Sequence, residues 1–142
     1  MESNQLTLLE QPGRYAICRL PAKAAIPEWC WQGDFCSLTR TMAEVSIVCQ
    51  EGLIPVGQVQ ALKIEPDWRM FKVAGELDFS LTGVIAGISS VLAAAGLGIF
   101  VLSTFNTDYV LVKSRDFEAA GEALRRAGYR VTAEGGINDV QF

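Results

Sequence analysis

A chain of 142 residues that is 50% hydrophobic and 20% charged has a globular composition, and it can form one compact core or two small modules. Its net charge of −4, with no cluster of Lys or Arg, argues against a nucleic-acid partner, because phosphate backbones are bound by concentrated positive charge. The chain has no histidine, which excludes histidine-dependent nucleophiles and every zinc site that uses this residue.

The four cysteines, at positions 18, 30, 36 and 49, form no C-x-x-C pair, so neither a redox motif nor a structural zinc site is indicated. We expect Cys18 and Cys49, which fall within apolar runs, to be buried as small hydrophobic side chains. Residues 1–11 carry two acids, no base and no long apolar stretch, so we expect no signal peptide. The expected compartment is the cytoplasm.

The N-terminal part of the chain, residues 1–65, predicts an irregular unit rich in strands. Strands are expected at residues 6–9, 15–20, 35–41 and 44–49. The last two of these form a predicted hairpin. Pro21 and Pro27 enclose a stretch too short for a good helix, where Trp29 and Trp31 are candidates for packing.

The C-terminal part, residues 66–142, predicts the order βαββαβ. The expected elements are a strand at 68–73, a helix at 81–95, strands at 98–105 and 109–112, a helix after Ser114 and a strand at 129–132. We expect Ser114 to cap the second helix, and Gly96 and Gly128 to end the two helices. This order is that of a ferredoxin-like unit, an antiparallel sheet with both helices on one face.

The predicted helix at 81–95 lies in a segment without charge that runs from Asp78 to Asp108. The segment exceeds the roughly 20 residues that a membrane span needs, but glycines and hydroxyl residues interrupt it and no basic anchor lies close by. We therefore favour a soluble helix followed by a buried strand. Small residues flank its apolar stripe, so we expect packing within the monomer, or against the other half or a second subunit. The amide groups at its start would favour a carboxylate.

Several of these residues resemble a known family. Leu-Thr-Gly-Val at 81–84, Ala-Gly-Leu-Gly-Ile at 95–99 and Leu-Ser-Thr at 102–104 are similar to the ACT domain of allosteric amino-acid enzymes. The longer string from 79 to 112 resembles tandem ACT proteins related to aspartate kinase regulatory regions and to CASTOR-type arginine sensors. The resemblance implies an α+β fold of two ferredoxin-like (βαββαβ) ACT-type units, of which the first is degenerate.

The resemblance also implies a ligand site. Its residues would be Thr82, Gly83, Val84, Thr104, Phe105, Asn106 and Asp108. Backbone groups of Gly83 and Val84 would contact the ligand, Thr104 and Phe105 would line the pocket, and Asp108 would pair with an ammonium group. Two simpler interpretations stay open: Thr104 and Phe105 pack as part of a strand, and Asp108 caps a turn.

The function that the resemblance implies is that of a regulatory or sensor protein. Its ligand would be a small molecule, an amino acid, held at the interface between ACT units of a homodimer, with no cofactor, nucleic acid or membrane involved. The alternative is a structural protein that dimerises through its ACT units and binds no ligand. We expect no enzyme activity, because Glu44, Glu76, Asp78 and Asp108 include no pair whose spacing forces them into one site.

Overall fold

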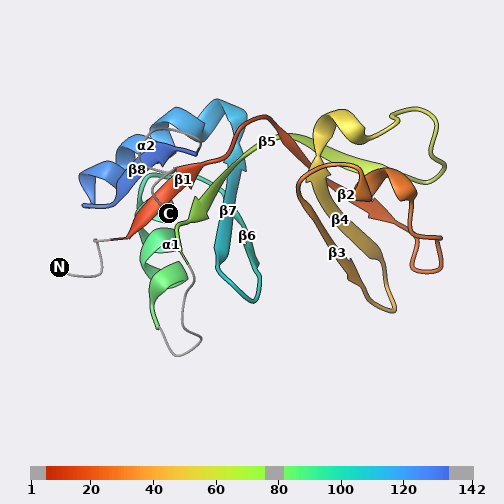
Figure 1. Cartoon of the computed structure of the whole chain (residues 1–142), viewed down its shortest axis with the longest axis horizontal. Helices are drawn as coiled ribbons and strands as arrows, with labels where there is room; N and C mark the ends of the chain where they lie inside the picture. Colours follow the sequence, from red (N-terminus) through yellow and green to blue (C-terminus); the bar gives the residue numbers. More distant parts are fainter. Residues whose placement is uncertain (1–5, 76–81, 135–142) are drawn as a thin grey trace. The chain divides into compact units, whose positions relative to one another are not determined.

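The computed structural model describes residues 6–75 and 82–134, and it shows a mixed α+β fold with mostly antiparallel strands (Figure 1). The chain divides into two compact units, an N-terminal unit of residues 13–68 and a C-terminal unit of residues 1–12 and 69–142. The predicted boundary at residue 65 places the first strand in the N-terminal part of the chain. In the structure, that strand belongs to the C-terminal unit.

The N-terminal unit is an antiparallel sheet with the strand order β3-β4-β2-β5, in which β5 contributes its first part. Its elements are β2 (Tyr15–Leu20), η2 (Glu28–Trp31), β3 (Cys36–Arg40), β4 (Val45–Gln50), η3 (Glu51–Leu53) and the start of β5 (Lys63–Val73). The predicted hairpin is present as β3 and β4. No α-helix forms within residues 13–68, all of which the structure describes, so this unit lacks the helices of a complete ferredoxin-like unit.

All four cysteines take part in the core of the N-terminal unit. Cys18 and Cys49 are buried, as predicted, and Cys30 of η2 is buried with them. Cys36 packs against the same cluster, because the β3–β4 register places it directly opposite Cys49. The thiols therefore act together with Ile47 and its neighbours as hydrophobic filling between the sheet and η2.

The C-terminal unit contains the predicted order βαββαβ, with one additional strand. Its elements are β1 (Thr7–Glu10), the end of β5, α1 (Val84–Ala94), β6 (Phe100–Ser103), β7 (Asp108–Lys113), η4 (Ser114–Asp116), α2 (Phe117–Arg126) and β8 (Arg130–Ala133). Strand β7 pairs with β5 and β6, and β1 pairs antiparallel with β5 and parallel with β8. The N-terminal strand β1 therefore lies between the first and last strands of the βαββαβ unit.

Both helices pack onto a single core. Ile88 and Leu92 of α1 are fully buried in the same cluster as Leu124 of α2. The Phe117 ring of α2 stacks on Phe71 of β5 with 4.7 Å between ring centroids. The 3.6-residue spacing of these apolar side chains explains why the helices could be predicted. Neither α1 nor α2, the α-helices within the described residues, is long enough to cross a bilayer.

The ends of the helices match the sequence prediction better than their starts. Gly96 and Gly128 have φ angles of +79° and +103°, and each closes a Schellman motif in which the next residue donates back into the last turn. The predicted cap at Ser114 is wrong: α2 begins after Asp116, because a 3₁₀ turn starts at Ser114. The Ser114 hydroxyl is buried and has no hydrogen-bond partner within the described residues.

Candidate functional site

The β6–β7 turn is tied to the end of β5 by one buried hydrogen bond. The Thr107 hydroxyl, whose residue is 2% exposed, donates to the Val73 carbonyl oxygen at 2.7 Å. Figure 1 shows that α1 also starts at this end of the C-terminal unit. The fold therefore brings the end of β5, the start of α1 and the β6–β7 turn to one end of the unit, which we call the α1 end.

The start of α1 has the local geometry of an anion-binding helix terminus. Gly83 is the N-cap residue with φ +81°, and it has no side chain with which to cap the helix. A Cβ atom added at Gly83 would meet nothing within 4 Å, so the space next to the backbone is open. Thr82 is exposed, whereas Val84 is half-buried against the core. Within the described residues no side chain caps the first amide groups of α1, and their partial positive charge favours a carboxylate.

The turn residues divide into two structural roles. Thr104 closes the turn, because its hydroxyl donates to the Thr107 carbonyl at 3.1 Å and accepts from the Thr107 amide at 3.3 Å. Phe105 is 80% exposed and Asn106 is exposed, so both side chains lie largely in solvent. The interpretation of Phe105 as strand packing is therefore wrong, since it follows the end of β6 at Ser103.

Asp108 begins β7 directly opposite Ser103. The Ser103 hydroxyl donates to Asp108 Oδ1 at 2.6 Å, a short distance that is typical of a hydrogen bond to a carboxylate. Asp108 is partly exposed. Its second carboxylate oxygen has no protein partner within the described residues, so it can accept a hydrogen bond from a ligand.

The seven residues of the predicted site therefore form two groups at the α1 end. One group comprises Thr82, Gly83 and Val84 at the helix start, and the other comprises residues 104–106 and Asp108 in and beside the turn. The hydrogen bonds of Thr104 and Asp108 within the described residues stay inside the turn. Among the described contacts of these residues, the second carboxylate oxygen of Asp108 has no protein partner, whereas the Thr104 hydroxyl is engaged by Thr107.

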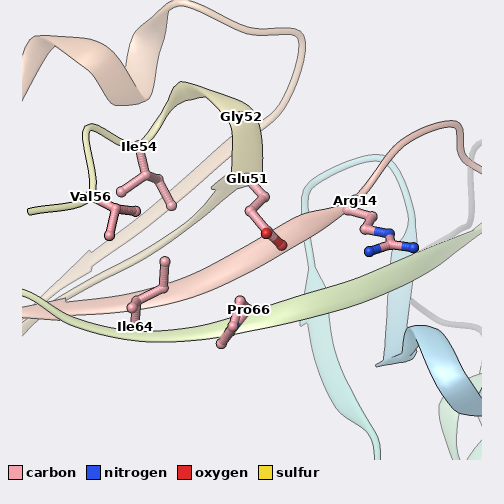
Figure 2. Close-up of a pocket in the computed structure, with 7 residues that line it drawn as sticks. All are labelled: Arg14, Glu51, Gly52, Ile54, Val56, Ile64 and Pro66. Atoms are coloured by element: carbon pink, nitrogen blue, oxygen red, sulfur yellow. The ribbon is translucent and has the colours of Figure 1, made fainter.

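The N-terminal unit contains a cavity that the sequence did not predict (Figure 2). It has a volume of about 580 Å³, and we call it the Arg14 pocket. The pocket is lined by Arg14, Glu51, Gly52, Ile54, Val56, Ile64 and Pro66. Figure 2 shows the charged ends of Arg14 and Glu51 on one side and the side chains of Ile54, Val56 and Ile64 on the other.

Three residues hold the charged side of the Arg14 pocket in place. Arg14 Nη1 lies 3.0 Å from Asp67 Oδ1, and the Asp67 amide donates to Glu51 Oε1 at 2.8 Å. The Glu51 amide in turn donates to the Arg14 carbonyl at 2.9 Å. Asp67 has φ +68°, at a shift in the β2–β5 register between Tyr15 and Ile17. These contacts join segments that are far apart in the chain, so no local pattern could reveal them.

Neither Cys18 nor Cys49 provides a reactive thiol. Burial raises the pKa of Cys18 to about 11 and that of Cys49 to about 12, which keeps both thiols protonated near neutral pH. Among residues 6–75 and 82–134, no group of three or more Cys, Asp and Glu side chains could hold a metal ion.

Two family models match the sequence. The model of the ACT domain matches residues 63–126, and a model of an N-terminal domain matches residues 13–57. The human cytosolic arginine sensor for mTORC1 subunit 1 is 38% identical over 60 residues. That alignment covers 42% of this chain and 18% of the sensor, so the chain matches less than one fifth of the sensor's length.

Solved structures extend the similarity to nearly the whole chain. An X-ray structure of a protein from Agrobacterium tumefaciens has 40% sequence identity and a TM-score of 0.83, covering 93% of this chain and 96% of that one. The ligand-free regulatory subunit of aspartate kinase from Thermus thermophilus has a TM-score of 0.57 at 15% identity, covering 81% of this chain and 93% of that one. The second likeness shows the fold alone. The match at residues 63–126 confirms the predicted resemblance: the chain contains an ACT domain.

Proposed function

We propose that this protein is a regulatory module that senses a free amino acid and performs no catalysis of its own. The observation that carries the proposal is the α1 end of an ACT domain, where uncapped helix amides lie at the same end as a turn with an available carboxylate at Asp108. The relatives named as an arginine sensor and as an aspartate kinase regulatory subunit support a regulatory role. The name of the sensor also supports a cytoplasmic location.

The two groups at the α1 end complement the two charges of an amino acid. The ligand carboxylate would accept hydrogen bonds from the amides at Gly83 and Val84, where the helix dipole is positive. The ligand ammonium would pair with Asp108, whose orientation Ser103 fixes. Thr104 and Asn106 would border the ligand from the turn. Each contact uses a group that is open in the described part of the C-terminal unit.

We further propose that a second ACT unit covers the site in a homodimer. Phe105 is a large apolar side chain that is 80% exposed at the turn, and burying it against a ligand or a partner would remove that surface from water. Such a cover would exclude water from the Asp108 ion pair and strengthen it. The alternative is a protein that dimerises through this unit and binds no ligand.

Thermal unfolding in the presence of each of the twenty amino acids tests the proposal. A ligand that binds only the native state at a hundredfold excess over its Kd stabilises the protein by about 2.7 kcal/mol, so the Tm should rise clearly for one amino acid or a small related group. Asp108→Asn should remove this rise. Asp34→Asn, the same chemical change at an exposed residue of the N-terminal unit, should preserve it.

Two outcomes would contradict the proposal. One is that no amino acid changes the Tm while sedimentation shows a dimer. This result would favour the purely structural alternative. The other is that Asp108→Asn leaves the rise in Tm intact for every amino acid that produces one, which would exclude Asp108 from the site.

A further inference from the structure

We propose that the Arg14 pocket of the N-terminal unit is a second ligand site, separate from the α1 end, and that it binds a free α-amino acid with an aliphatic side chain. All seven lining residues belong to the N-terminal unit, so the pocket does not depend on the ACT-type site. Its volume of about 580 Å³ falls within the range of roughly 300–1,000 Å³ that is usual for small-molecule sites.

The charged side of the pocket provides partners for both ends of a zwitterion. Arg14 uses Nη1 for Asp67, and a guanidinium has five N–H donors, so the others can bind a carboxylate while the ion pair with Asp67 is kept. Glu51 accepts the Asp67 amide through Oε1, which leaves its second oxygen for an ammonium group. One cation, Arg14, and one carboxylate, Glu51, therefore line the same side, and this pair matches the carboxylate and the ammonium of an amino acid.

The opposite side of the pocket is aliphatic. Ile54 is 7% exposed and forms a buried base, whereas Val56 is 64% exposed at the rim. Ile64 and Pro66 of β5 complete this wall. No charged side chain other than Arg14 and Glu51 lines the cavity, so this side favours a branched alkyl group over a polar one.

The backbone beside the charged side is held in an unfavourable conformation. Asp67 has φ +68°, a region that L-residues rarely occupy, and both Arg14 and Glu51 contact it. Such outliers cluster at ligand sites, because the surrounding contacts fix groups in the positions that binding needs. Here the contacts of Asp67 with Arg14 and Glu51 hold the side chains of Arg14 and Glu51 in place before a ligand arrives.

Calorimetric titration of the full chain with L-leucine tests the proposal, with three analogues that each lack one feature. Leucinamide lacks the carboxylate, 4-methylpentanoate lacks the ammonium group, and glycine lacks the alkyl group. Leucine should bind, and each analogue should bind at least tenfold more weakly. Equal binding of 4-methylpentanoate would overturn the proposal, because the Glu51 carboxylate would then have no role.

Variants locate the binding and separate the two sites. Arg14→Gln and Val56→Asp should each weaken leucine binding at least tenfold. Because Val56 is exposed, Val56→Asp should leave the fold intact, and far-UV circular dichroism would check this. Arg126→Gln, which removes a surface guanidinium on α2, should leave leucine binding unchanged. Absence of leucine binding would refute this site. Leucine binding that Asp108→Asn abolishes and Val56→Asp leaves intact would also refute it, but the proposal for the α1 end would then stand.

Discussion

Gly87 of α1 lies directly against the side chain of Tyr129. A Cβ atom at position 87 would come within 2.8 Å of the Tyr129 hydroxyl oxygen, closer than real Cβ contacts allow. Tyr129 is 6% exposed and precedes β8, so its ring has little room to move. The sequence predicted that the small residues beside the apolar stripe of this helix pack against something. For Gly87, packing within the C-terminal unit is the explanation.

We predict that Gly87→Ala destabilises the protein by about 1–2 kcal/mol, although alanine favours helices by about 1 kcal/mol. Removing the hydroxyl with Tyr129→Phe should relieve most of this loss, giving a coupling energy above about 0.5 kcal/mol in a double-mutant cycle measured by urea unfolding. Ser90→Ala, at an exposed position of the same helix, should not destabilise. Strict additivity of the two substitutions would show that the contact is not formed.

The Thr107 hydroxyl should contribute to stability through its bond to Val73. Thr107→Val keeps the shape of the side chain but removes the donor, which leaves a buried carbonyl without this partner and should lower the free energy of unfolding by about 1–3 kcal/mol. Thr107→Ser retains the hydroxyl and should lose less. If valine and serine variants unfolded at the same urea concentration, the hydrogen bond would have no measurable effect.

The backbone at Asp67 allows a comparison of charge with conformation. Asp67→Ala removes the Arg14 partner and places alanine at φ +68°, so we expect a loss of about 1–2 kcal/mol. Asp67→Asn also removes the charge, but asparagine tolerates this region, and the ion pair is half-exposed and worth under about 1 kcal/mol. In urea unfolding, the Asn variant should therefore have a free energy of unfolding close to that of the wild type, and the Ala variant a lower one. A loss as large for Asn as for Ala would assign the effect to charge alone.

The buried thiols should make the protein less stable in alkali. Burial raises the pKa of Cys18 and Cys49 from 9.0 in the unfolded chain to about 11 and about 12 in the folded protein. Above pH 9.0 the unfolded chain therefore binds fewer protons than the folded one, and the free energy of unfolding falls until the pH passes the folded values. Urea unfolding across this range should show the fall, and Cys49→Ala should reduce its slope. A free energy of unfolding that does not fall above pH 9.0 would contradict the burial of these thiols.

The elements of the C-terminal unit could be predicted because their signals are local. Phe117, Ala120 and Leu124 repeat with the helical period, and Gly96 and Gly128 end helices through contacts within a single turn. Ser114 misled the prediction, since a capping residue looks the same in sequence whether it precedes an α-helix or a 3₁₀ turn.

Features that depend on distant segments could not be predicted in this way. Strand β1 pairs Leu8 with Val73 and with Val131, and no pattern near residue 8 specifies either partner. The Arg14 pocket is similar, because its charged side joins residues 14, 51 and 67. The residues of the α1 end were named from family resemblance, and their binding of a ligand stays a prediction.

An NMR titration most directly tests the claim that the α1 end binds an amino acid. The full chain, labelled with ¹⁵N, would be titrated with the amino acid for which Asp108→Asn most reduces the rise in Tm. We predict that the amide signals of Gly83, Val84 and residues 104–108 shift most, with saturation, and that Asp108→Asn abolishes these shifts. Unchanged signals at these positions, at a concentration that raises the Tm, would contradict the claim.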